Sequence, residues 1–245
     1  AGAGWATIIA QLISGLLCLL YIAKRFPILW LKKEDWRVEG HRLLEHARVG
    51  LPMGFQTSII AIGSIILQGT LNTFGSLYVS SFTAAQKIDQ LATQPLMSFG
   101  ITMATYAAQN YGAGNMVRIK KGVNRCILIS ISISLIGGAA IILAGYGLVG
   151  LFVSDSPEIV ELAQVYLRIT TACYSLLALL FIFRYTLQGL GRSLIPTVAG
   201  IVELVMRTMA AVVLARLLDF TGVCMASPVA WLGALVPLSI AYFVT

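Results

Sequence analysis

The sequence predicts an all-α, polytopic membrane helix bundle, and two observations support this prediction. No charged residue occurs from Val49 to Gln86, from Gln90 to Val117, or from Cys126 to Ser154. Only 11% of the 245 residues are charged and 58% are hydrophobic, whereas about 25% of an ordinary soluble domain is charged. A charge at the bilayer centre costs roughly 2.5–3.5 kcal/mol, so long uncharged runs indicate membrane spans. Because lipid offers no hydrogen-bond partner to the backbone, these spans should be helices.

The apolar runs divide into seven predicted spans, each long enough to cross about 30 Å of hydrocarbon. The predicted ranges are 3–23, 50–71, 79–108, 126–150, 163–187, 195–217 and 228–245. No basic segment precedes the first span, so a signal peptide is not predicted. Because both ends lie in apolar runs, the chain is expected to be part of a longer protein.

The net charge of +7 is concentrated in loops on one side of the predicted topology. The long loop 24–48 and the loop after the third span, with Arg118, Lys120, Lys121 and Arg125, are strongly basic. The positive-inside rule places these loops in the cytoplasm, as in an integral protein of the bacterial cytoplasmic membrane. Nucleic acid is not an expected partner, because no basic segment is interleaved with aromatic residues.

The loop 24–48 has two possible structural interpretations. Its apolar residues recur among charges at loose helical spacing, which favours a segment lying in the membrane interface; a plain linker with snorkelling lysines is the alternative. The apolar residues are Leu31, Trp36, Val38, Leu43 and Leu44, with Val49 directly after the loop. In either case the loop is the best candidate boundary between two bundles.

An internal repeat relates the openings of the first and seventh spans. Residues 2–12 and 222–232 share Gly, Ala, Ala and Leu at matching positions, and Thr7 aligns with Ser227. The two segments lie six spans apart in one predicted orientation, which is typical of parallel six-span repeats in secondary transporters.

Four stretches resemble the multidrug and toxic compound extrusion (MATE) transporters, in order along the chain. They are Ala1–Gln11, Gly50-Leu51-Pro52-Met53-Gly54, the run from Ala84-Ala85 through Ile88, Pro95 and Gly100-Ile101 to Ala107-Ala108-Gln109-Asn110-Tyr111-Gly112-Ala113-Gly114, and Gln188-Gly189-Leu190-Gly191-Arg192 with Pro196. The resemblance implies a twelve-span transporter of two six-helix lobes around a central cavity.

The resemblance also implies a domain organisation and an activity. Residues 1–23 would be the last span of the N-terminal lobe, 24–48 the basic cytoplasmic linker, and 49–245 the C-terminal lobe, cut short in its last span. Such transporters export organic cations or amphipathic compounds in exchange for H⁺ or Na⁺, without a cofactor, and this chain alone is expected to be inactive without its N-terminal lobe.

The chain departs from the family in its acidic residues. Some members have carboxylates in the seventh and tenth spans, but Val49–Gln86 and Ile169–Phe183 contain none. A sodium site built from this lobe's own carboxylates is therefore in doubt, and coupling through the missing lobe is the favoured scheme.

The strongest candidates for a transport pathway lie in the predicted third span, where Lys87 and Asp89 are costly intramembrane charges. A polar stripe that should face a cavity, with Asp89 as proton or cation acceptor, consists of Gln86, Asp89, Gln90 and Thr93, and Met97 continues the same face. The alternative is hydrogen bonding between helices with a local Lys87–Asp89 balance. Pro95 can kink this helix.

Further polar residues occur in other spans. Glu203 and Arg207 are spaced i, i+4 and should form an ion pair, with a structural or a gating role. Gln56 should contact either substrate or a neighbouring helix, and Arg184 is interpreted as snorkelling from a span end.

The sequence favours three alternatives less: a related flippase, a receptor and an enzyme. A lipid-linked oligosaccharide flippase should have more intramembrane Lys and Arg, and a seven-span receptor predicts no repeat. An enzyme is not predicted, because the sequence shows neither a catalytic constellation nor a metal motif, and Cys18, Cys126, Cys173 and Cys224 form no cluster.

Overall fold

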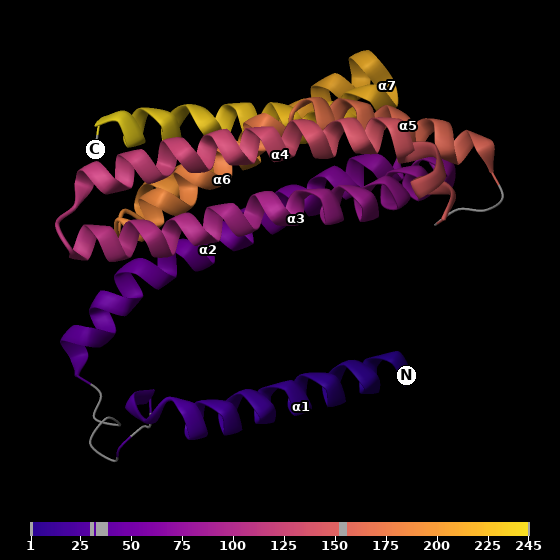
Figure 1. Cartoon of the computed structure of the whole chain (residues 1–245). Coiled ribbons are helices and arrows are strands. Elements are labelled where there is room, and N and C mark those ends of the chain that lie inside the picture. Colours follow the sequence, from indigo (N-terminus) through magenta and orange to yellow (C-terminus); the bar gives the residue numbers. More distant parts are fainter. Residues whose placement is uncertain (1, 30–31, 33–38, 152–155, 245) are drawn as a thin grey trace. The chain divides into compact units, whose positions relative to one another are not determined.

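The structure, a computed structural model, describes residues 2–29, 32, 39–151 and 156–244, and every regular element in these ranges is a helix (Figure 1). The described residues form two compact units, 1–47 and 48–245. The elements are α1 (Gly2–Arg25), the 3-10 helix η1 (Pro27–Leu29), α2 (Gly40–Asn72), α3 (Ser76–Gly112), α4 (Met116–Gly150), α5 (Pro157–Ala172), α6 (Tyr174–Gly189) and α7 (Leu194–Val244).

The first unit contains α1, η1 and the start of α2, and α1 is apolar and exposed along nearly its whole length. Helix α2 begins at Gly40, so the end of the predicted linker 24–48 is helical rather than a loop. Leu43 and Leu44 are exposed on this helix. Leu31, Trp36 and Val38, on which the interfacial interpretation also rests, lie outside the described residues.

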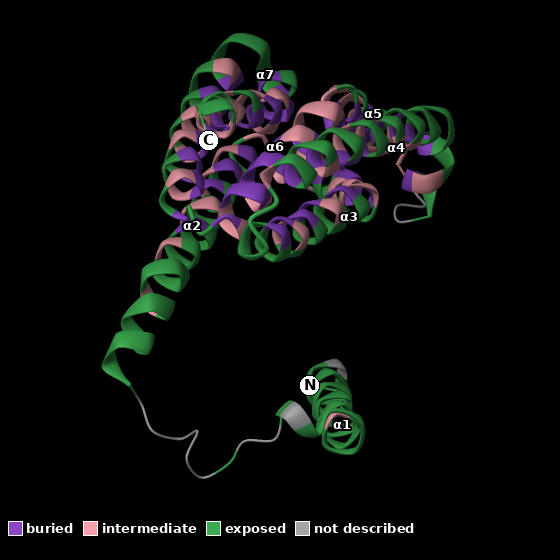
Figure 2. Ribbon diagram, turned by 60° about the vertical axis from the view of Figure 1, so that its left-hand side comes forward, coloured by how far each residue is buried: buried purple, intermediate pink, exposed green. Residues whose placement is uncertain are grey.

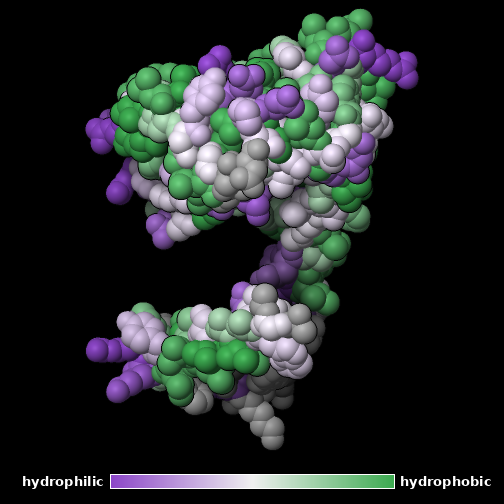
Figure 3. All heavy atoms as spheres, turned by 90° about the vertical axis from the view of Figure 1, so that its right-hand side faces the viewer, coloured by the Kyte–Doolittle hydropathy of each residue, from purple (hydrophilic) through white to green (hydrophobic). Residues whose placement is uncertain are grey.

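In the second unit, α3, α4, α6 and α7 run alongside one another around a buried interior (Figures 1 and 2). The interior consists of two apolar clusters, one containing Phe82 and Leu167 and the other Val123 and Leu187. Exposed apolar side chains such as Leu143 are numerous on the outside of this unit, and patches of hydrophobic residues are visible on the face that Figure 3 shows. A surface of this kind suits contact with lipid rather than water.

Among the described residues, α1, α2, α4 and α7 are long and apolar enough to cross a membrane, and the bent pair α5–α6 could add a fifth span. Helix α3 is outside this set, although its 37 residues contain the predicted span 79–108. It runs on through Pro95, so the proline does not end the helix.

Helix α7 contains both of the last two predicted spans. Its 51 residues leave helical geometry at Asp219, where φ is 51° and ψ is −135°. A side chain at Gly222 would collide with the backbone carbonyl of Leu214, so the chain folds back closely at this break. The predicted span 163–187 is helical on both sides of a break at Cys173, where α5 and α6 meet at a bend of 50°.

The turn between α3 and α4 explains part of the family motif. Gly114 has φ of 69°, which a residue with a Cβ rarely adopts. The amide of Asn115 donates to the carbonyl of Asn110 at 2.9 Å, and the Asn115 side chain then accepts from the Arg118 amide at 3.1 Å. The run Asn110–Gly114 therefore ends one helix, and Asn115 caps the next.

Close packing of α3 on α6 depends on Gly189, where an added Cβ would collide with the backbone carbonyl of Ala104. We expect Gly189→Ala to lower the stability of the protein by about 1–3 kcal/mol, because the backbones must separate. Gly147→Ala on α4 is the matched control. A Cβ at position 147 would have no neighbouring atom within 4 Å. This variant should leave the stability unchanged or raise it slightly, since Ala favours the helix more than Gly does. Equal thermal midpoints for the two purified variants would contradict this account.

Candidate functional site

The first candidate site is a carboxylate held by two tyrosines where α5 meets α6. The Tyr174 hydroxyl donates to Oδ1 of Asp89 at 2.8 Å, and the Tyr166 hydroxyl donates to Oδ2 at 3.4 Å. Both tyrosines are buried and Asp89 is half-buried. The Tyr166 ring packs edge-on against Phe82, which fixes its position. The site can hold a proton or a cation on the carboxylate while the hydroxyls keep its orientation.

The other residues of the predicted stripe are less enclosed. Gln86 and Thr93 are half-buried, and Gln90 and Met97 are exposed. The Thr93 hydroxyl donates to the carbonyl of Asp89 at 2.9 Å, inside the helix. Their role in a pathway stays a prediction.

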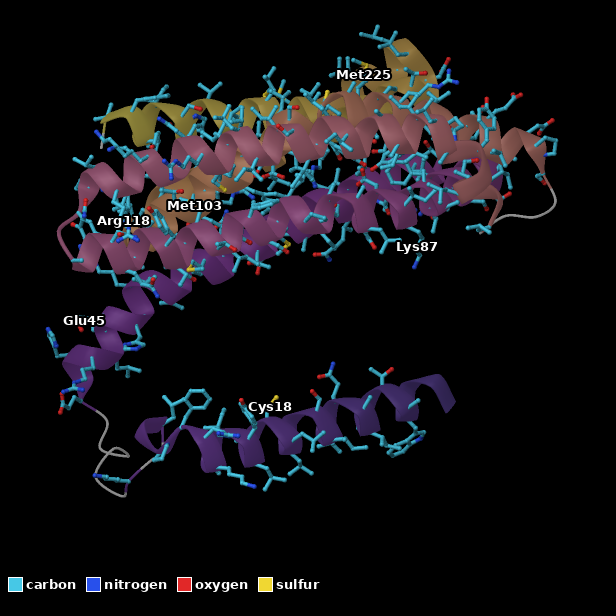
Figure 4. The ribbon with its side chains drawn as sticks, viewed as in Figure 1. Cys18, Glu45, Lys87, Met103, Arg118 and Met225 are labelled. Atoms are coloured by element: carbon cyan, nitrogen blue, oxygen red, sulfur yellow. The ribbon has the colours of Figure 1, made fainter. Side chains whose placement is uncertain are left out.

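Lys87 lies apart from the carboxylate site. Its side chain is exposed and points away from the other helices of the second unit (Figure 4). The hydrogen bonds to Asp89 come from tyrosines on α5 and α6. The local Lys87–Asp89 balance is therefore not what orients this carboxylate.

The second candidate site is a buried triad of charges on α6 and α7. Glu203 accepts from Nη2 of Arg184 at 2.6 Å and from Nη2 of Arg207 at 2.7 Å. The predicted Glu203–Arg207 pair is thus present, with less than a tenth of each side chain exposed. Nη1 of Arg207 also donates to the Ser64 hydroxyl of α2 at 3.4 Å.

The snorkelling interpretation of Arg184 is wrong. Its side chain is only 7% exposed and is bound to Glu203. A lone arginine would have to reach the interface, but a carboxylate across the helix contact removes that need. The triad contains two cations and one anion, and the Nε atoms of both arginines have no hydrogen-bond partner among the described residues.

Gln56 lies between helices rather than in an open cavity. It is 4% exposed, and its amide oxygen accepts from Nε2 of Gln188 at 2.9 Å. Its side chain also contacts α7 at Gly200. The geometry therefore shows the second of the two predicted options, a contact with a neighbouring helix.

Sequence reasoning missed Tyr166, Tyr174, Arg184 and Gln188 as partners of the residues it selected. Each lies more than fifteen residues from its partner, so no spacing rule within one helix could pair them. The detectable signal was weaker: hydroxyl and amide groups inside apolar spans, which must find partners when buried. Within the described ranges, no group of three or more His, Cys, Asp or Glu residues could hold a metal ion.

The basic segments of the second unit gather at one end of the bundle. Arg48 and Arg192 line a common pocket. Tyr106 of α3 donates its hydroxyl to the carbonyl of Arg118 in α4 at 3.0 Å. In Figure 1 the α3–α4 and α6–α7 turns lie at the same end, whereas the α4–α5 connection lies at the other.

These features define the class as a polytopic helical membrane protein with charged sites inside its bundle. The sequence profile of the MatE family matches residues 52–213, and the chain belongs to this family. It is a family of transporters, so the prediction that the chain is not an enzyme is confirmed, as are the fold class and the family resemblance.

Similar proteins support the assignment. The chain is 27% identical over 205 residues to the probable multidrug resistance protein YpnP of Bacillus subtilis, a match to 83% of this chain and 45% of that protein. It is 23% identical over 223 residues to the multidrug export protein MepA of Staphylococcus haemolyticus, covering 91% and 49%. The chain thus spans about half the length of the curated relatives it matches.

Solved structures show the same fold. A crystal structure of MATE in complex with MaL6 superposes with a TM-score of 0.87 at 22% identity, over 99% of this chain and 55% of that one. A MOP superfamily transporter from Pyrococcus furiosus gives a TM-score of 0.86 at 21% identity, over 99% and 54%.

Proposed function

We propose that this chain is the C-terminal lobe, with one preceding span, of a secondary antiporter. The transporter would export organic cations or amphipathic compounds in exchange for H⁺ or Na⁺ by alternating access. The observation that supports this best is Asp89, a carboxylate inside an apolar bundle whose two oxygens both accept tyrosine hydroxyls at a helix break. Costly intramembrane carboxylates are typical of proton and ion relays.

The geometry suggests how such a carboxylate could couple to motion. Asp89 lies on α3, and its hydroxyl partners lie on either side of the bend between α5 and α6. Loss of the negative charge on Asp89 would weaken both hydrogen bonds, because bonds to charged acceptors are about twice as strong as neutral ones. Binding of the coupling ion to Asp89 would then shift the equilibrium between conformations of the α5–α6 bend.

The remaining assignments of the proposal follow the chain's family and charges. The N-terminal lobe would be the partner that completes the pathway, and it could hold the main coupling carboxylate. The basic end of the bundle would face the cytoplasm of a bacterial cell by the positive-inside rule. MatE membership favours this transporter over the flippase and the receptor, and the relatives are named for multidrug export or resistance.

The test is transport by the full-length protein in proteoliposomes loaded with a fluorescent organic cation. A pH gradient and a Na⁺ gradient are imposed in separate experiments. One of them should drive movement of the dye against its concentration gradient, and an ionophore that collapses that gradient should stop it. Vesicles with this 245-residue chain alone should show no driven movement. Dye movement whose rate depends on neither gradient would overturn the antiport proposal.

A further inference from the structure

A groove of about 480 Å³ lies between α3 and α4 at the basic end of the bundle. Its lining includes three cationic side chains of α4: Arg118, Lys121 and Arg125. Spacings of three and four residues place these three on one face of the helix. All three are exposed, and no Asp or Glu lines the groove in the described part of the chain.

Another part of the lining, which we call the floor of the groove, is apolar. It contains Met103 of α3 and Cys126 and Ile129 of α4. Figure 4 shows Met103 and Arg118 in the seam between the two helices. Cys126 also opens the uncharged run that continues to Ser154. The lining therefore changes from cationic to apolar along α4, in the direction of this uncharged run.

One wall of the groove is fixed by Tyr106. Its hydroxyl donates to the Arg118 carbonyl at 3.0 Å, and its ring packs so closely on Gly122 that a Cβ there would collide with it. The ring thus occupies the space that a larger residue on α4 would fill. This contact holds α3 and α4 at the spacing that leaves the groove open.

From this geometry we propose that the groove is a binding site for one anionic phospholipid. The phosphate would lie among Arg118, Lys121 and Arg125, and an acyl chain would follow Met103 and Ile129 toward the membrane interior. Three cations without a carboxylate select an anion, and basic pockets between transmembrane helices suit acidic headgroups. The apolar floor distinguishes a lipid from a soluble phosphate. This inference needs only that the bundle lies in a membrane, so it stands or falls independently of transport.

The test is native mass spectrometry of the full-length protein, delipidated and then titrated with phosphatidylglycerol or phosphatidylcholine of matched chains. The wild type should bind phosphatidylglycerol tightly at one site and phosphatidylcholine at least tenfold more weakly. The triple variant R118Q/K121Q/R125Q should lose affinity for phosphatidylglycerol by on the order of 100-fold, at about fivefold per cation near an anionic lipid. Each single variant should lose about fivefold.

The matched control is K120Q/R168Q/R216Q, which removes three exposed cations that do not line the groove. It should keep the wild-type affinity and headgroup preference. Ile129→Gln tests the floor: it should weaken phosphatidylglycerol binding but leave any binding of glycerol 3-phosphate unchanged. Equal binding of the two lipids, equal losses in the triple variant and its control, or glycerol 3-phosphate competing as well as the lipid would each overturn the proposal.

Discussion

Replacing Glu203 with Gln is expected to lower the free energy of unfolding by about 3–5 kcal/mol, the range seen when a buried ion pair loses one partner. Glu203 is the acceptor for both Arg184 and Arg207. Its neutralisation would leave two guanidinium groups, each less than a tenth exposed, without a counter-charge. The measurement is the unfolding midpoint of the purified full-length protein in a detergent–denaturant titration.

The two arginines should behave differently from the glutamate. Arg184→Met or Arg207→Met leaves one cation paired with Glu203, so each should cost only about 1.5–3 kcal/mol, the value of a hydrogen bond to a charged group. Glu161→Gln, an exposed carboxylate on α5, is the control and should be near neutral. If either arginine variant were less stable than Glu203→Gln, the two-to-one charge balance would be the wrong description of this triad.

The triad also shows how far the sequence could be read. The spacing of Glu203 and Arg207 predicts their pairing, because i and i+4 residues share a helix face. Arg184 lies on another helix, and its pairing depends on how α6 packs on α7. A rule about single arginines near span ends could not anticipate that contact. The pair within one helix was therefore predictable, whereas the contact of Glu203 with Arg184 on another helix was not.

The break between α5 and α6 could not be predicted for a similar reason, because it depends on packing between helices. Residues 163–187 read as one apolar span, and neither glycine nor proline occurs at Cys173, where α5 and α6 separate. The bend brings the Tyr174 hydroxyl to Asp89, a contact between segments 85 residues apart. By contrast, apolar length alone predicted that the region would be helical, since lipid allows little else.

Replacing Asp89 with Asn is expected to weaken the coupling between ion gradient and substrate in the full-length protein, as for a second coupling carboxylate beside one in the N-terminal lobe. The amide can still accept a hydrogen bond from Tyr174, so the packing should survive, but it can neither take up a proton nor balance a cation. A coupling free energy of 1–3 kcal/mol corresponds to a factor of about 5–150. The rate of gradient-driven dye transport should therefore decrease by a factor in that range. Counterflow of dye without a gradient should change far less.

Tyr174→Phe tests the orientation of the Asp89 carboxylate without removing its charge. It removes the 2.8 Å hydrogen bond but keeps the ring in its buried position, so coupling should fall less than in Asp89→Asn. The double variant should be no worse than Asp89→Asn alone, because two residues that act through one interaction are not additive. Glu161→Gln should transport normally. Additive losses would mean that the tyrosine acts elsewhere, and wild-type coupling in Asp89→Asn would place the coupling ion outside this lobe.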